Sequence, residues 1–210
     1  MRFRIDPTRE ERRRHLRAAK LCHQVYTRAE DVHVEHAHPE DDHTYVVVEG
    51  SDSVANWRDN LDVRRIDGMH RGFARYARRC VDRYRLIDVL EQNERIVITG
   101  HSQGAAAALL IAHMLRAHTR NVVEVVLFGC PNIGDDAFSA SLLEETGDPS
   151  VFLYRNGRDI VCALPFGFLG FSNALCAHTI ELKPKSVGFF GPVRSHMIDQ
   201  YVDSLESVYV

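Results

Sequence analysis

One short segment restricts the fold more than any other part of the chain. Residues 100–104 read Gly-His-Ser-Gln-Gly, and they stand between the apolar run 96–98 and the alanine-rich run 105–112. A buried strand, a tight turn and a buried helix in this order are typical of a nucleophile elbow, where side chains larger than glycine would clash with the strand and the helix. The pattern predicts Ser102 at a strand end, with the positive N-terminus of a helix beside it.

Strand-like and helix-like segments alternate along the rest of the chain. This rhythm predicts an α/β fold, in which a mostly parallel central sheet is flanked by helices and residues 1–210 form a single domain. The expected strands are 44–49, 95–99, 122–128 and 151–154. The expected helices are 6–26, a basic N-terminal helix packed on the domain, followed by 69–91, 103–118 and 197–208.

Charge, cysteine content and the N-terminal segment restrict the class of protein. The formal net charge is −3, so we expect no nucleic-acid partner for the protein as a whole, although the basic segment 2–20 by itself could contact anionic lipid or nucleic acid. Charge runs of this kind are more often a solvated helix face. The N-terminus lacks an apolar h-region, and the five cysteines form no CxxC pair. These features predict a cytoplasmic protein with reduced thiols and no disulfide framework, and a secreted protein trimmed of its signal is the alternative.

A serine hydroxyl needs an adjacent base, and the histidines after residue 102 are the candidates. His113 and His118 lie well along the helix that follows the serine, so their side chains cannot reach back to it. We favour His196, which follows a glycine-rich loop and precedes the last predicted helix. His178 precedes a strand-like segment and is expected to be a structural, hydrogen-bonding residue.

The acid that orients the base should lie beyond the carboxyl end of another strand. Asp159 meets this condition, because it follows the predicted strand 151–154 across a turn. It would hold the imidazole in one tautomer and stabilise its charged form. Asp135 and Asp136 follow a different strand and look more like the N-cap region of a helix.

An acyl-transfer site also needs hydrogen-bond donors for the negative oxygen of the intermediate. The backbone N–H of Gln103, directly after the serine, is the first expected donor. The second should come from the loop after the predicted strand 44–49, where Ser51 offers its backbone N–H and its hydroxyl. The residue types alone leave an ordinary Gly-Ser turn open at this position.

A group of histidines and acids suggests a different class of site, one that holds a metal ion. Imidazole and carboxylate groups suit divalent transition metals, but no helical spacing such as H-E-x-x-H is present, and polar loops of this kind are usually solvated. We therefore expect neither a metal nor a cofactor. The residues concerned are His33, Glu35, His36, His38, Glu40, Asp41, Asp42 and His43.

Several motifs between Thr44 and Tyr201, taken in order, resemble those of the class 3 lipase family, the fungal-type triacylglycerol lipases. They are Val-Val-Val-Glu-Gly-Ser at 46–51, His-Arg-Gly-Phe at 70–73, the segment 100–104, Phe-Gly-Cys-Pro-Asn-Ile-Gly at 128–134, Asn-Gly-Arg-Asp-Ile-Val at 156–161 and Ser-His-Met at 195–197. The resemblance implies an α/β-hydrolase fold. It also implies a catalytic triad of Ser102, Asp159 and His196 and an oxyanion role for Ser51.

The resemblance further implies hydrolysis of acylglycerol-type or other lipid esters through an acyl-enzyme intermediate. A phospholipase, a thioesterase or an acyltransferase with the same triad remains an alternative, as does a non-catalytic interaction domain that keeps the fold. The partners would be a lipid or small-ester substrate and, transiently, a membrane or lipid surface.

The chain departs from the family pattern in the segment where a lid begins. Glu49 replaces the usual arginine before the glycine of the oxyanion loop, and the segment 51–68 is short and charged. We therefore expect little interfacial activation and substrates such as small esters or partial glycerides. Trp57, Phe166 and Phe168 are the candidate substrate-binding residues, with core packing as the alternative role for the two phenylalanines.

Overall fold

A seven-stranded sheet forms the middle layer of the protein. The computed structural model describes residues 1–28, 30–38, 41–50, 64–144, 149–172, 174–183 and 191–209. The strands are β1 (Arg2–Phe3), β2 (Val32–Glu35), β3 (Thr44–Val48), β6 (Ile96–His101), β7 (Val122–Phe128), β8 (Ser150–Asn156) and β9 (Thr179–Leu182). Their order is β1-β8-β7-β6-β3-β2, and β9 also pairs with β8. The antiparallel pair is β2–β3, and the remaining pairs are parallel.

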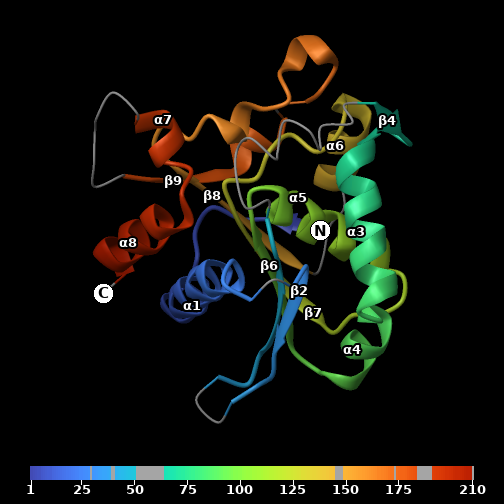
Figure 1. Ribbon diagram of the computed structural model, residues 1–210, viewed down its shortest axis with the longest axis vertical. Helices are drawn as coiled ribbons and strands as arrows, with labels where there is room; N and C mark the ends of the chain where they lie inside the picture. Colours follow the sequence, from blue (N-terminus) through green and yellow to red (C-terminus); the bar gives the residue numbers. More distant parts are fainter. Residues whose placement is uncertain are drawn as a thin grey trace.

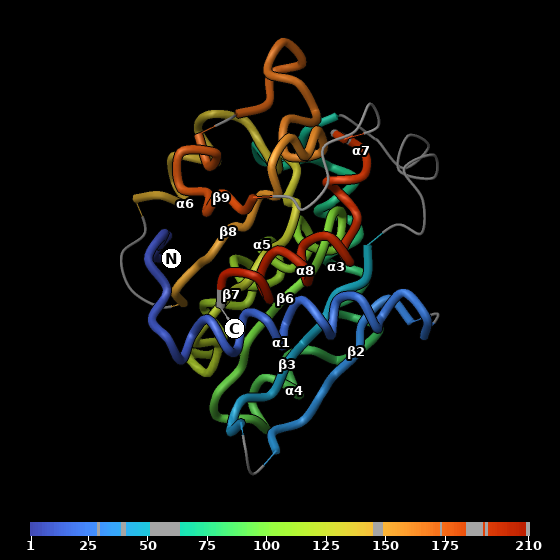
Figure 2. The backbone as a smooth tube through the Cα atoms, turned by 90° about the vertical axis from the view of Figure 1, so that its left-hand side faces the viewer, coloured from blue at the N-terminus to red at the C-terminus, as the bar shows by residue number. Residues whose placement is uncertain are grey.

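Helices cover both faces of this sheet (Figure 1). One face carries α1 (Arg9–Val25) and α8 (Ile198–Tyr209), which lie side by side across the strands in Figure 2. The other face carries α3 (Arg71–Arg83), α4 (Leu86–Gln92), α5 (Gln103–Leu115) and α6 (Asp136–Glu144). The predicted α/β architecture with a mostly parallel sheet is therefore confirmed. Within the described residues, no helix is both long and apolar enough to cross a membrane.

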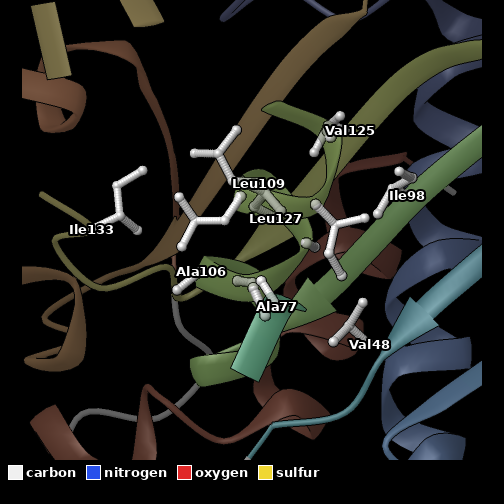
Figure 3. Close-up of a cluster of buried hydrophobic side chains, with 14 of the residues drawn as sticks. Val48, Ala77, Ile98, Ala106, Leu109, Val125, Leu127 and Ile133 are labelled. Atoms are coloured by element: carbon white, nitrogen blue, oxygen red, sulfur yellow. The ribbon is translucent and has the colours of Figure 1, made fainter. Parts of the chain in front are cut away.

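Alternate residues of each central strand enter different cores, because side chains along a strand point to opposite faces. Ile98, Val125 and Leu127 pack against α5 in the larger core, where Ala106 and Leu109 lie among them (Figure 3). The intervening strand residues pack against α1 and α8 in the second core. The small alanines of α5 allow this helix to approach the sheet closely, and the approach fixes the position of its first turn.

The predicted helix 69–91 is wrong in its limits. Met69–His70 forms β5, which pairs with β4 (Arg65–Ile66), so the helix begins two residues later than expected. A break then separates α3 from α4 at Arg85, whose φ of 48° is left-handed. A backbone in the left-handed conformation cannot continue a right-handed helix, so the chain turns before α4 begins.

The basic N-terminal helix also begins later than predicted. Thr8 caps α1 and forms a capping box with Glu11, in which each side chain bonds the other residue's backbone N–H. Pro7 therefore precedes the cap instead of lying in the first turn. From this start, α1 packs on the sheet and against α8, and its last turn ends beside the carboxyl end of β6.

Candidate active site

Three side chains that are far apart in the sequence meet beyond the carboxyl ends of the central strands. The Oγ atom of Ser102 lies 2.9 Å from Nε2 of His196, and Nδ1 of His196 lies 2.8 Å from Oδ2 of Asp159. All three side chains are buried. The structure thus brings together the three residues for which the sequence predicts catalytic roles.

Ser102 occupies the sharp turn between β6 and α5. Its backbone has φ 59° and ψ −126°, which is a strained conformation for a residue with a side chain. A Cβ atom added at Gly100 would lie 2.3 Å from the carbonyl oxygen of Gly104, and one added at Gly104 would lie 2.2 Å from the carbonyl oxygen of Val48. Only glycine allows these two backbone approaches, so the two glycines hold the serine at the tip of the turn.

His196 lies in the turn between α7 (Gly191–Arg194) and α8. Because the carboxylate of Asp159 only accepts, Nδ1 of the imidazole donates to it and carries the proton. The Nε2 atom then has a lone pair that accepts the Ser102 hydroxyl hydrogen. This tautomer is the one in which the ring can take a proton from the serine.

Asp159 follows β8 and accepts three hydrogen bonds. Its Oδ1 accepts the backbone N–H of Val161 at 2.9 Å, and its Oδ2 accepts both the His196 ring N–H and the Tyr201 hydroxyl. Burial by itself raises the pKa of this carboxyl, but the His196 and Tyr201 donors and the Val161 N–H together hold the pKa below its usual value. The acid therefore stays ionised behind the imidazole.

Two neighbours of the triad were not predicted as functional residues. Tyr201 ends the region that resembles the family and has no predicted role, and neither has His101, which lies beside the His196 ring. Both are buried aromatic side chains, and neither is one of the ionised groups from which the catalytic candidates were chosen. The signal that could have found them is position, because His101 precedes the nucleophile and Tyr201 lies on the first turns of the helix after the base.

The remaining predicted site residues differ in location: one is buried, two are exposed and two are not described. Gln103 is the first residue of α5 and is buried, so its backbone belongs to the positive end of that helix. Ser51 and Trp57 lie outside the described residues. Phe166 and Phe168 are on the surface, with 43% and 84% of their area exposed. Their rings stack on each other with the ring centroids 5.5 Å apart.

The rival candidates lie elsewhere. The ring of His178 faces Phe3 at a centroid distance of 5.9 Å, at the β1–β9 edge of the sheet. Asp135 accepts the backbone N–H of Phe138 and caps α6, which is the N-cap role that the sequence predicts for this region. His113 lies near the C-terminal end of α5.

Among the described residues, Asp41, Asp42 and His43 form the group that could hold a metal ion. The Nδ1 atom of His43 lies 2.9 Å from a carboxylate oxygen of each aspartate. Arg17 pairs with Asp41 and Arg95 with Asp42, so cations of the protein already neutralise both carboxylates. The group precedes β3, at the end of the sheet opposite the triad, and it has no part in the chemistry there.

Comparison with known families and sequences gives a consistent result. The model of the Lipase (class 3) family matches residues 45–168. A lipase of Rhizomucor miehei is 35% identical over 148 residues, which cover 60% of this chain and 39% of that protein. A secreted mono- and diacylglycerol lipase of Gibberella zeae is 37% identical over 86 residues, which cover 38% of this chain and 26% of that protein. The chain thus matches well under two thirds of the length of these relatives.

Solved structures share the fold at low sequence identity. The native Rhizomucor miehei lipase–propeptide complex has a TM-score of 0.61 and 24% identity, with 86% of this chain and 70% of that chain covered. Lipase II from Rhizopus niveus has a TM-score of 0.64 and 19% identity, with 86% and 80% covered. A triacylglycerol lipase whose catalytic centre is formed by a serine protease triad has a TM-score of 0.57 and 24% identity, with 86% and 82% covered. These neighbours confirm the predicted α/β-hydrolase fold.

The prediction of a cytoplasmic location is contradicted by the relatives. The Gibberella zeae relative and a further one from Malassezia globosa, 31% identical over 113 residues that cover 53% of this chain and 33% of that protein, are both secreted lipases. The five cysteines are free thiols in the structure, but a chain without disulfides is compatible with either compartment. Free thiols and the N-terminal residues were therefore too weak a basis for that prediction.

Proposed function

The chain belongs to the class 3 lipase family, and we propose that it hydrolyses carboxylic esters of acylglycerol type through an acyl-enzyme on Ser102. The hydrogen-bonded row from Ser102 through His196 to Asp159 is the observation that supports this activity most directly. A serine hydroxyl is a poor nucleophile without a base in contact with it, and this row supplies the base and the group that orients it.

In the first step, Oγ of Ser102 attacks the ester carbonyl carbon while Nε2 of His196 takes the hydroxyl proton. The carbonyl oxygen becomes negative at the N-terminus of α5, where the backbone N–H of Gln103 is the proposed donor. The tetrahedral intermediate then collapses, the bond to the alcohol oxygen breaks, and the imidazolium gives its proton to that oxygen. Asp159 remains ionised and stabilises the charged ring throughout.

In the second step, a water molecule gives a proton to His196 and attacks the acyl-enzyme carbonyl. The intermediate collapses, Ser102 recovers its proton from the imidazolium, and the carboxylic acid leaves. Ser51 is proposed as the second oxyanion donor on the basis of the sequence alone, because it lies outside the described residues.

The proposed substrates are partial acylglycerols or smaller lipid esters. This choice rests on the family, on the names of the secreted relatives and on the short, charged segment that stands where the family has its lid. A phospholipid is the second candidate, because a phospholipase A1 of Arabidopsis thaliana is 29% identical over 101 residues that cover 47% of this chain and 24% of that protein.

Contact with a lipid surface is part of the proposal. Large apolar side chains are exposed on several segments that follow the carboxyl ends of the strands or border the histidine turn. Exposed apolar groups around a site are typical of lipid or protein contact. These residues are Ile66, Ile160, Phe166, Phe168, Leu169, Val193 and Met197.

The deciding experiment compares the parent with Ser102→Ala on p-nitrophenyl esters from short to long acyl chains. We expect Ser102→Ala and His196→Ala each to lower kcat by on the order of 10³-fold or more, leaving only what the oxyanion donors and binding provide. His178→Ala is the matched control and should keep the parent's kcat. Equal losses at both histidines in folded protein would contradict the assignment of the base.

A second arm separates an enzyme from a binding domain that merely keeps the fold. A fluorophosphonate probe should label Ser102 in the parent and leave Ser102→Ala unlabelled. Folded parent protein that takes up no label and turns over none of the esters would show that the chain is not a hydrolase. Diacylglycerol and phosphatidylcholine, compared as substrates in the same vesicles, decide between the two lipid classes.

A further inference from the structure

A second histidine lies directly against the catalytic base. His101 is the last residue of β6, and its ring lies 4.6 Å from the His196 ring, with 31° between the two planes. The Nε2 atom of His101 is 2.6 Å from the backbone carbonyl oxygen of His196. A carbonyl oxygen only accepts, so Nε2 carries the proton and donates to it. His101 therefore holds the backbone of the residue whose side chain acts as the base.

The other nitrogen of His101 is occupied by a tyrosine from the N-terminal helix. The Tyr26 hydroxyl lies 2.7 Å from Nδ1 of His101. In a ring that is protonated on Nε2 and neutral, Nδ1 is an acceptor, so the tyrosine hydroxyl donates to it. This pairing fixes both the tautomer and the orientation of the His101 ring. It also connects the C-terminal end of α1, where Tyr26 is the cap residue, to the turn that carries the base.

His101 is neutral in this position. Burial first, and then the neighbouring His196, together lower the pKa of His101 to about 3. A neutral ring suits its place, because His196 becomes positively charged when it takes the serine proton. A second positive ring at the same contact distance would oppose that charge.

The same pair also borders the loop that leads to the predicted oxyanion residue. A Cβ atom added at Gly50 would lie 2.3 Å from the Tyr26 hydroxyl oxygen and 2.6 Å from the carbonyl oxygen of His101. Gly50 directly precedes Ser51 in the sequence. The backbone at Gly50 therefore packs directly on the Tyr26–His101 pair.

We propose that Tyr26 and His101 are positioning residues, which clamp the His196 turn and the Gly50 backbone in the geometry that ester hydrolysis requires. This role rests on the function proposed above. Neither side chain bonds to the reacting groups of the triad. Their contribution is to keep the imidazole within reach of the serine and to hold the Gly50 backbone at a fixed distance from the base.

The first test removes the hydroxyl of Tyr26 and little else. On a soluble short-chain p-nitrophenyl ester, Tyr26→Phe should lower kcat about tenfold and leave KM within about twofold, because a positioning defect affects the transition state more than substrate binding. Tyr45→Phe is the matched control. It also loses one hydrogen bond, from its hydroxyl to Asp41 at 2.6 Å, and it lies in the same core, but at the far end of the sheet.

The second test replaces His101 by Gln and by Asn, whose side-chain amides reach the positions of the two ring nitrogens, Nε2 and Nδ1. The amide of Gln reaches the position of Nε2, so His101→Gln should keep the bond to the His196 carbonyl, lose the acceptor of the Tyr26 hydroxyl and fall in kcat no further than Tyr26→Phe does. The amide of Asn reaches only the position of Nδ1, so His101→Asn should lose about tenfold or more. If Tyr26→Phe does not fold, these two His101 variants are sufficient to test the proposal.

The rate of fluorophosphonate labelling separates positioning from loss of folded protein. A positioning defect lowers the rate constant for labelling Ser102 in proportion to kcat and leaves the final labelled fraction unchanged. Wild-type values of kcat and of the labelling rate in Tyr26→Phe and His101→Asn would overturn the clamp, and so would an equal loss in Tyr45→Phe. A parent that neither labels nor hydrolyses esters would instead refute the proposed function itself.

Discussion

The hydroxyl of Tyr201 donates a hydrogen bond of 2.5 Å to Oδ2 of Asp159, the same oxygen that accepts the ring N–H of His196. Tyr201 also accepts the backbone N–H of Asn156 and is completely buried. Burial and the neighbouring carboxylate raise the pKa of the Tyr201 phenol, so it remains a donor throughout the physiological range. The Oδ2 atom of Asp159 thus connects the His196 ring to α8, the helix that carries Tyr201.

Removing this donor should affect both turnover and acid stability. In Tyr201→Phe we expect kcat to fall about three- to tenfold and the pKa of Asp159 to move up toward its ordinary value. A depressed pKa stabilises the fold above the unfolded pKa of about 3.9, and that stability is lost as pH falls through the folded pKa. The variant should therefore unfold at a higher pH in an acid titration followed by circular dichroism. An unchanged acid midpoint would argue against this role.

Replacing the acid itself should be more severe. Asp159→Asn offers an amide where the structure has a buried carboxylate, so the imidazole would be held in the wrong tautomer and its positive charge left unbalanced. We expect kcat to fall by on the order of 10³- to 10⁴-fold with little change in KM, as measured on a soluble ester. A loss of less than about tenfold would show that Asp159 is not the orienting group.

A buried ion network anchors α1 to the sheet away from the triad. Glu124 on β7 accepts hydrogen bonds from Arg14 and from Nε2 of His15, at 2.9 Å and 2.8 Å, and Nδ1 of His15 lies 2.7 Å from the Tyr154 hydroxyl. Burial raises the pKa of the Glu124 carboxyl, but its His15 and Arg14 partners outweigh burial and hold the pKa below the usual value.

For this network, Glu124→Gln should lower the free energy of unfolding by about 2–4 kcal/mol at neutral pH, because it leaves the largely buried Arg14 guanidinium without its anion. The parent's advantage is present above the unfolded pKa of about 4.3 and should shrink as pH falls through the depressed folded pKa. Urea unfolding at neutral and acidic pH measures both values. A parent and variant that differ equally at both pH values would contradict the ionised state of Glu124.

The exposed aromatic pair should contribute to binding of a lipid surface and not to the chemistry. Phe168→Ser, made in a Ser102→Ala background, should bind phosphatidylcholine vesicles that contain diacylglycerol about tenfold less tightly in a flotation assay. Val208→Ser is the matched control, since Val208 is 56% exposed but lies near the C-terminal end of α8. With Ser102 restored, Phe168→Ser should hydrolyse a soluble ester like the parent. Equal vesicle binding by both serine variants would remove Phe168 from the lipid contact.

Local sequence was sufficient for the elements that surround the nucleophile. The strand 122–128 matches β7 at both limits, and the apolar run, the two glycines and the alanines between residues 96 and 112 predict β6, the turn and α5. These elements are decided by steric fit and by apolar patterning over a few neighbouring residues. The errors arose where the spacing of apolar residues gives no signal. The short strands β1 and β2 were not predicted, and nothing in the apolar spacing indicates the left-handed backbone of Arg85 between α3 and α4.

What the sequence determined by itself is the α/β order of elements, the strained turn at Ser102 and a short set of candidate partners for it. Only the tertiary structure decided which of them meet. His196 is 94 positions from Ser102, and Tyr26 is 75 positions from His101, and no local pattern encodes either contact. Such pairs form because the parallel strands bring their carboxyl ends to one edge, while α1 and α8 pack on the same face of the sheet. Hydrogen bonds with directional geometry then select one tautomer of each imidazole from those that the sequence allows.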